Sequence, residues 1–217
     1  TDPSGQHYTT TTTFAYVNGQ KIVTTIDAAG DKSSITYDVL GRIVDIMNVR
    51  GYHTYYHYDL TTGRKDYMLD AAGNKTTYTY DQVGNLMSQT VTRQNGAVTI
   101  TTRFSYDHLN RLLVTIYASG TADQMSTTTD YDALGRIDEQ TDGLGRITKY
   151  THNDLDQLTL VQNAFGTSVE ADWQYAYDAV GDLLQTIDPD GNITARTYYN
   201  NGQVKSVTLG FGTSDAS

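Results

Sequence analysis

Residues 77–90 read TYTYDQVGNLMSQT and hold a Tyr-Asp pair, Tyr80-Asp81, closely followed by a Gly-Asn pair, Gly84-Asn85. Polar and apolar residues alternate on both sides of this motif. Tyr and Thr favour a pleated strand, whereas Asp and Gly favour a tight turn. The stretch therefore predicts a strand, a turn and a second strand.

This pattern recurs along the chain. Full copies are Tyr37-Asp38 with Gly41, Tyr80-Asp81 with Gly84, Tyr131-Asp132 with Gly135, and Tyr177-Asp178 with Gly181. Altered copies are Tyr58-Asp59 with one extra residue before Gly63, Tyr106-Asp107 with Asn110 for Gly, and His152-Asn153 with Asp156 for Gly. Shortened copies are YVNGQ from Tyr16 and YNNGQ from Tyr199. The nine anchor positions (16, 37, 58, 80, 106, 131, 152, 177 and 199) are 21 to 26 residues apart, which predicts one supersecondary unit, here called a tile, per repeat.

A second turn signal lies between the anchors. An Asp or Asn stands three residues before a Gly in the segments that begin at Asp27, Asp70, Asp142, Asn163 and Asp188. The first side chain of such a turn accepts backbone hydrogen bonds, and its Gly takes positive φ. Each tile is therefore predicted to have two strands and two turns.

The strand before each anchor alternates with a period of two residues. In one tile Thr76, Tyr78 and Tyr80 share one face, and Thr77 and Thr79 share the other. We expect the face with the aromatic residues to be buried by the apolar residues that begin each following strand, such as Leu86. By the same reasoning Trp173 is expected in a core. The sequence predicts an all-β fold of tandem hairpins in a curved or spiralling antiparallel sheet, with contacts between neighbouring tiles providing the stability.

Composition agrees with this fold and narrows the function. Of 25 acidic residues only Glu139 and Glu170 are Glu, so turn formers prevail over helix formers. The net charge of −10 disfavours nucleic acid as a partner. The chain has no Cys, and no apolar run approaches the roughly 18 residues of a membrane span. The polar start TDPSGQHYTT is not a signal peptide, so we expect residues 1–217 to be one repeat array cut from a larger protein, with any export signal elsewhere.

The tiles YDVLGR, YDQVGN, YDALGR and YDAVGD resemble the Rhs/YD repeats of bacterial polymorphic toxins, of insecticidal toxin complexes and of animal teneurins. The resemblance extends from about Phe14 to Val207. It implies a β-ribbon that spirals into a hollow shell around a C-terminal toxin, in a secreted or cell-surface protein of bacteria. Its partners would be neighbouring shell segments and the enclosed toxin domain. The aspartate motif that releases the toxin in complete members is not found, so the resemblance extends only to the shell wall. It assigns a structural role to Tyr37, Asp38, Gly41, Tyr58, Asp59, Gly63, Tyr80, Asp81, Gly84, Tyr106, Asp107, Tyr131, Asp132, Gly135, Tyr177, Asp178 and Gly181.

Other functions have weaker support in the sequence. No GxSxG, HExxH or P-loop motif is found, and we expect no catalytic residue, cofactor or metal site. His53 and His57 share a strand face and are at most half a metal site, and the dispersed Asp residues suit turns better than calcium. The main alternative is an adhesion or carbohydrate-binding module, which needs aromatic residues clustered on a face open to water. A glycan-cleaving enzyme would need two paired carboxylates, and the sequence selects no pair.

The two ends of the array are predicted sites of self-association. The segments Thr9–Phe14 and Gln203–Leu209 contain a single charged residue, Lys205, and unpaired strand edges recruit other chains.

Overall fold

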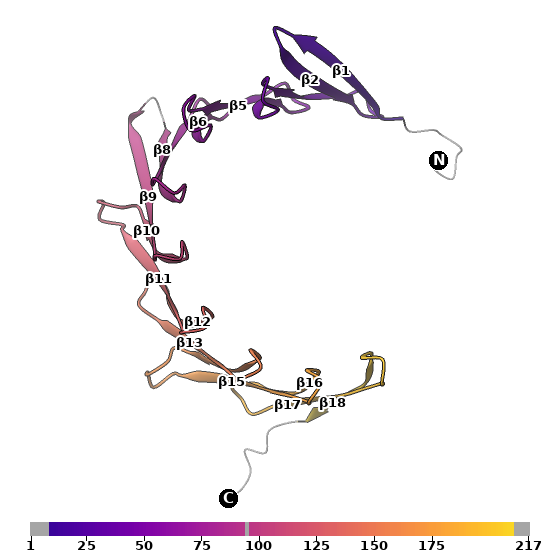
Figure 1. Ribbon diagram of the computed structural model, residues 1–217, viewed down its shortest axis with the longest axis vertical. Helices are drawn as coiled ribbons and strands as arrows, with labels where there is room; N and C mark the ends of the chain where they lie inside the picture. Colours follow the sequence, from indigo (N-terminus) through magenta and orange to yellow (C-terminus); the bar gives the residue numbers. More distant parts are fainter. Residues whose placement is uncertain (1–8, 94–95, 211–217) are drawn as a thin grey trace, which may run out of the picture. The chain divides into compact units, whose positions relative to one another are not determined.

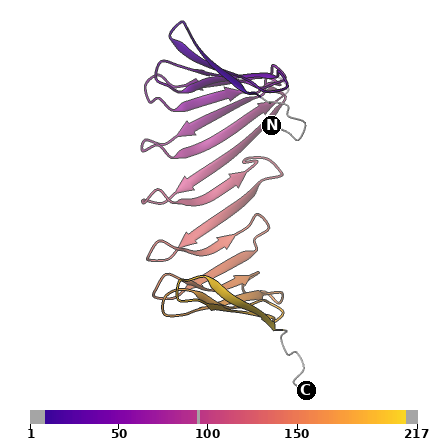
Figure 2. The same ribbon diagram turned by 90° about the vertical axis from the view of Figure 1, so that its right-hand side faces the viewer.

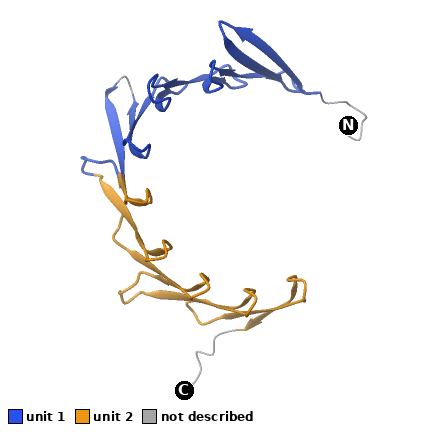
Figure 3. Cartoon of the chain, in the orientation of Figure 1, with its two compact units in different colours: residues 1–104, 117–122 blue, residues 105–116, 123–217 orange. Residues whose placement is uncertain are grey.

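The computed structural model of the chain describes residues 9–93 and 96–210. Its regular structure consists of 18 β-strands, with no α-helix in the described residues. The chain divides into two compact units, residues 1–104 with 117–122 and residues 105–116 with 123–217 (Figure 3). The predicted all-β class is confirmed. Within the described ranges, no helix has the length and apolarity needed to cross a membrane.

The first unit consists of strands that pair antiparallel with their neighbours in sequence, from β1 through β9. These strands are β1 (Thr11–Val17), β2 (Gln20–Ile26), β3 (Lys32–Tyr37), β4 (Ile43–Met47), β5 (His53–Tyr58), β6 (Lys65–Leu69), β7 (Lys75–Tyr80), β8 (Leu86–Arg93) and β9 (Val98–Tyr106). The last two residues of β9 fall in the second unit.

The second unit repeats this arrangement, and its strands β11 to β18 pair successively and antiparallel. Its strands are β10 (Leu112–Tyr117), β11 (Met125–Tyr131), β12 (Ile137–Thr141), β13 (Ile147–His152), β14 (Leu158–Asn163), β15 (Ala171–Tyr177), β16 (Leu183–Ile187), β17 (Ile193–Tyr198) and β18 (Val204–Gly210).

In each unit the connections alternate between the two edges of the sheet (Figure 2). Every Tyr-Asp turn follows an odd-numbered strand, so these turns share one edge, and the intervening turns share the other. The strands of each unit also change direction progressively, so each unit is a curved sheet (Figure 1).

A β-bulge lies beside the anchor in most tiles, which the sequence pattern did not predict. Thr36 pairs with Asp45 but Tyr37 pairs with Ile43, so Val44 is an extra residue on the second strand. The same register shift precedes Tyr58, Tyr80, Tyr131, His152, Tyr177 and Tyr198. Because a bulge bends its strand and increases the local twist, its repetition contributes to the curvature of each sheet.

The aromatic face is less buried than the sequence predicted. The buried residues among those described are Thr76 and Thr115, and no hydrophobic residue there is buried. Tyr56, Tyr78 and Tyr150 are half-buried. The reason is that each unit is a single layer of sheet, so the residues on either face have strand neighbours but no second layer above them.

Two further expectations are corrected. Trp173 is 37% exposed and lies opposite Val161, not in a core. The last tile is anchored by Tyr198 and not by Tyr199, because Tyr198 has the bulge register of the other anchors and precedes Gly202 by the usual four residues.

The first tile has a different turn from the other tiles. Asn18 and Gly19 have positive φ and form a two-residue hairpin turn between Val17 and Gln20.

Candidate functional site: the Tyr-Asp turns

Each Tyr-Asp turn is closed by its own aspartate. Asp38 Oδ1 accepts hydrogen bonds from the backbone N–H groups of Leu40 and Arg42, both at 2.9 Å. Backbone bonds from Gly41 to Asp38 and from Asp38 to Arg42 complete the turn. The same Oδ1 contacts recur at Asp107, Asp132 and Asp178. Asp81 accepts instead from the N–H groups of Gly84 and Asn85.

The residue four positions after the anchor has a left-handed backbone. The φ values are 79° at Gly41, 111° at Gly84, 86° at Gly135 and 98° at Gly181. Asn110 and Asp156, which replace Gly in altered tiles, both have φ of 62°. Asn and Asp tolerate this region better than other L-residues, so these substitutions preserve the turn.

The tile with an extra residue closes in a different way. Asp59 Oδ1 accepts from the N–H groups of Thr61 and Thr62 and from the Thr62 hydroxyl, and Gly63 has φ of 72°. The Arg64 guanidinium does not bind Asp59 of its own turn. It donates to the carbonyl oxygen of Asp81 in the next tile, at 2.9 Å.

The anchor tyrosines connect successive tiles. Tyr58 donates its hydroxyl to the carbonyl oxygen of Ile43 at 2.8 Å, and Tyr80 donates to Lys65 at 2.9 Å. In each case the acceptor begins the second strand of the preceding tile. Equivalent bonds join Tyr131 to Leu112, Tyr177 to Leu158 and Tyr198 to Leu183. Burial raises the pKa of Tyr58, Tyr80 and Tyr177, so these hydroxyls remain protonated donors.

Arginine residues reinforce the same connection. The Arg111 guanidinium donates to Asp107 Oδ2 at 2.7 Å within its own turn and lies 4.2 Å from the centre of the Tyr131 ring of the next tile. Arg42 likewise binds Asp38 and lies 4.5 Å from the Tyr58 ring. A guanidinium over an aromatic ring contributes about 0.5–1 kcal/mol at exposed sites. Arg136 instead binds Asp156 in the tile where His152 replaces tyrosine.

These contacts also set the charge of the turns. The N–H of Arg111 lowers the pKa of Asp107 more than burial raises it, and the Arg111 guanidinium lowers it further. The pKa of Asp142 is lowered chiefly by the side chain of Arg146. Asp107 and Asp142 are therefore ionised at neutral pH, and their oxygens accept hydrogen bonds from N–H groups. A calcium ion would have to displace these donors, which argues against calcium at the turns.

The opposite edge of the sheet uses related turns. Asp27, Asp70, Asp142 and Asp188 accept N–H groups as expected from the sequence. The segment that begins at Asn163 differs, because Ala164 takes positive φ and Phe165 bonds to Ile147. A further turn, Asn48 to Gly51, was missed although it has the same Asn-x-x-Gly signal.

His53 and His57 do not form one metal site. Four residues along a strand separate them by about 13 Å, too far for one ion to bind both rings at a ligand distance of about 2 Å. Each Nδ1 atom contacts a carboxylate, Asp45 at 2.9 Å and Asp66 at 2.7 Å. The described residues contain no group of three or more His, Cys, Asp or Glu side chains arranged for a metal ion.

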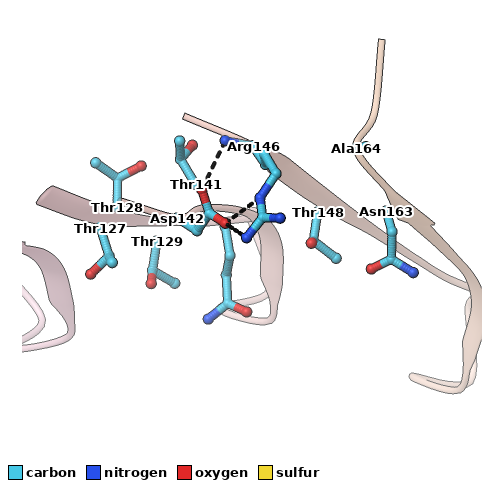
Figure 4. A pocket seen from close by; sticks show the side chains of 10 residues that line it. Thr127, Thr128, Thr129, Thr141, Asp142, Arg146, Thr148, Asn163 and Ala164 are labelled. Carbon is cyan, nitrogen blue, oxygen red and sulfur yellow. Dashed lines mark hydrogen bonds and ion pairs between the residues drawn. The ribbon is translucent and has the colours of Figure 1, made fainter. Parts of the chain in front are cut away.

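A polar hollow lies on the anchor-tyrosine face of the second unit (Figure 4). Its volume is about 540 Å³, and its lining includes Thr127, Thr129, Gln140, Thr148 and the Asp142–Arg146 ion pair. Asp142 is the one carboxylate among the lining residues, and it is bound by Arg146 at 2.6 Å. A glycosidase needs two carboxylates with separate roles, so this hollow lacks the groups for that chemistry.

Comparison with known proteins agrees with the repeat geometry. Residues 131–168 match the family model of the RHS Repeat. By this match the chain resembles the Rhs/YD-repeat family. Its fold is similar to the solved structure "TcdB2-TccC3-Cdc42", with a TM-score of 0.51 and 15% identity over 87% of this chain. It is similarly related to "TcdB2-TccC3 without hypervariable C-terminal region", with a TM-score of 0.51 and 16% identity over 93% of this chain.

The chain corresponds to a small part of these structures. It spans 13% of each of the two matched chains. At 15–16% identity the likeness concerns the fold alone. No curated protein matches this chain.

Proposed function

We propose that this chain is a non-enzymatic segment of an Rhs-repeat shell wall that encloses or scaffolds a toxin cargo in a larger secreted or cell-surface bacterial protein. The observation that carries the proposal is the edge of the sheet with the Tyr-Asp turns. At this edge the polar and charged side chains form the contacts that join neighbouring tiles. Asp107, Arg111 and Tyr131 bind one another or the backbone, so these side chains serve to join neighbouring tiles.

The single-layer construction supports the same role. A sheet held by cross-strand pairs and tile-to-tile contacts is extended by adding tiles, without the need for a central core. The fold is similar to parts of the two TcdB2-TccC3 structures, and this likeness supports a wall segment over a freestanding domain. The cargo and the other shell segments as partners rest on the family resemblance.

A wall has an inner and an outer face, and this property is directly testable. The chain contains no Cys, so single cysteines can be introduced without background labelling. Gln89→Cys places a thiol on the anchor-tyrosine face, and Thr79→Cys places one on the opposite face of the neighbouring strand. Both variants should be made in the larger protein and in the 217-residue chain.

Labelling rates should separate the two faces. In the larger protein we expect a small maleimide to reach both thiols, and a maleimide on a long polyethylene glycol to react with only one. In the isolated chain both thiols should react with the polymer. Equal reaction of both thiols with the polymer in the larger protein would contradict a closed wall.

A further inference from the structure

The Tyr-Asp turns of seven tiles each carry an exposed aliphatic residue. In six tiles it comes just before the turn residue with positive φ, and in the tile with the extra residue it comes just after Asp59. Isolated exposed apolar residues need no explanation, but a series along one edge indicates a surface that is covered by a partner. We call these residues, which are 60–92% exposed, the aliphatic row: Leu40, Leu60 and Val83 in the first unit, and Leu109, Leu134, Leu155 and Val180 in the second.

The turns do not need aliphatic side chains in order to close. Leu40, Leu109 and Leu134 contribute backbone N–H groups, which donate to the turn aspartates. Turns of the opposite edge have Arg50 and Asp190 at the same position, and their N–H groups donate in the same way. A polar residue therefore closes this kind of turn as well, and turn closure does not account for the aliphatic row.

The opposite edge of the sheet has a different surface. At the position before the positive-φ glycine, its short turns have Ala29, Arg50, Ala72, Leu144 and Asp190. Leu144 is the one large aliphatic residue among these five, and two of the turns end in exposed Ala-Ala pairs. The two edges are therefore unlike: one has projecting aliphatic side chains, and the other has mainly small or charged ones.

The aliphatic row has the period of the tile. Each tile adds two strands, and paired strands lie about 4.8 Å apart, so successive members of the row within one unit are about 10 Å apart. A partner that accommodates the whole row needs the same period, and another stretch of the same repeat has it. A lipid surface fits less well, because the ionised carboxylate of Asp107 lies in the same turn as Leu109 and would lose its hydration.

We infer that the aliphatic row packs against the opposite-edge turns of another stretch of the same repeat in the larger protein. The inference rests on the proposed shell wall. In each curved unit the strands run across the ribbon, so the turns, and not the faces, point toward a neighbouring stretch of wall (Figure 2). A ribbon that keeps its curvature and advances along its axis brings one edge beside the opposite edge of a later stretch. The aliphatic side chains then lie between turn tips of low profile, such as the Ala-Ala pairs, and bury apolar surface.

Photochemical cross-linking identifies the neighbour of the aliphatic row. A diazirine analogue of leucine would be placed in the larger protein at position 134 or 155, and at position 184 as the control, since Leu184 lies within strand β16 and not in a turn. We expect positions 134 and 155 to cross-link to opposite-edge turns of tiles that are distant in the same chain, and position 184 to give no such product. Cross-links to Tyr-Asp turns, to lipid, to the enclosed polypeptide or to another protein instead, or none beyond adjacent tiles, would overturn the inference.

Polar substitutions test whether this contact stabilises the wall. The triple variant Leu134→Asn, Leu155→Asn and Val180→Asn retains the backbone N–H donor of each turn. In the isolated 217-residue chain we expect an unchanged urea midpoint, because these residues are 70–84% exposed. In the larger protein the midpoint should fall by about 0.5 M or more, because there the side chains are covered.

An unchanged midpoint in the larger protein, or an equal fall in both proteins, would contradict the inferred contact. The failure of this contact can be told apart from the failure of the proposed function. Unequal polymer labelling of the two faces would still support a closed wall if the edges of the ribbon met through other residues.

Discussion

At the residue scale, the Tyr-Asp turn depends on a carboxylate and on a backbone with positive φ. Asp38, Asp107 and Asp132 each bind two N–H groups through Oδ1 and a guanidinium through Oδ2. A single side chain thus satisfies donors that would otherwise face solvent, which is the reason Asp recurs at this position and Glu does not.

The turn glycines should tolerate β-branched residues poorly. We expect Gly84→Val and Gly135→Val each to lower the free energy of unfolding by about 1–3 kcal/mol, because Val is strained at positive φ. A Cβ at Gly84 would also lie 2.8 Å from the Arg64 guanidinium. Chemical denaturation would measure both variants.

Thr79→Val is the control for these two variants. Thr79 lies in a strand, is exposed and bonds to the Ser88 hydroxyl at 2.7 Å, so its replacement should cost less, about 0.2–1 kcal/mol. Denaturation midpoints equal to those of the glycine variants would show that the turn backbone is not the strained element.

The turn aspartate Asp107 should make the free energy of unfolding depend on pH. The pKa of Asp107 is lowered in the fold, so its contribution is fully present above its unfolded pKa of about 3.9 and is lost as pH falls through the lower folded value. Asp107→Asn should therefore lower the urea midpoint more at pH 7 than at pH 3. An equal loss at the two pH values would contradict a role for the ionised carboxylate.

At the element scale, the tile is a hairpin with a bulge, tied to the preceding tile by its anchor tyrosine. The alternation of Tyr78, Thr79 and Tyr80 was sufficient to predict the first strand, and Asp81 with Gly84 was sufficient to predict the turn. The bulge was not predictable, because Val44 and Met87 are ordinary strand residues and their position depends on pairing. The placement of Arg111 over Tyr131 depends on how two tiles stack, and the spacing of one tile does not contain that information.

The sequence also led to an incorrect prediction of how deeply the residues of a tile are buried. Apolar residues at the start of the second strand, such as Leu86, suggested a core, but alternation identifies only which residues share a face. Whether a second layer covers that face depends on tertiary packing, and the single-layer sheet leaves these residues half-buried. The aspartate partners of His53 and His57 were missed because they come from the neighbouring strands.

The anchor hydroxyl should account for part of the coupling between tiles. Tyr80→Phe removes the donor to the Lys65 carbonyl oxygen and leaves the ring, so we expect a loss of about 0.5–1.5 kcal/mol in the free energy of unfolding. Tyr78→Phe is the matched control on the same strand and face, since the Tyr78 hydroxyl has no hydrogen-bond partner among the described residues. Equal losses in urea denaturation would indicate that the hydroxyl bond does not stabilise the stack.

At the scale of the whole molecule, stability comes from a series of similar contacts, and the strands at the ends of the series differ from the rest. Every residue of β1 and of β18 is exposed. Inner strands such as β4 and β14 are half-buried along their length. Exposed strands with few charges favour pairing with other chains.

We therefore predict self-association of the 217-residue chain through β1 and β18. Sedimentation over a concentration series should show association, and the double substitution Thr11→Lys and Thr13→Lys should reduce it by charge repulsion without changing the circular dichroism spectrum. A chain that remains monomeric at high concentration would show that these strands do not recruit partners.

The proposed role of this chain is to form part of a shell wall. Electron cryomicroscopy of the larger protein that contains it is the most direct test. We expect β1 to β18 to be continuous with further hairpins of the same kind, in a wall with density for a separate polypeptide on one face. A structure in which these tiles form an isolated arm, with solvent on both faces and no enclosed density, would contradict it.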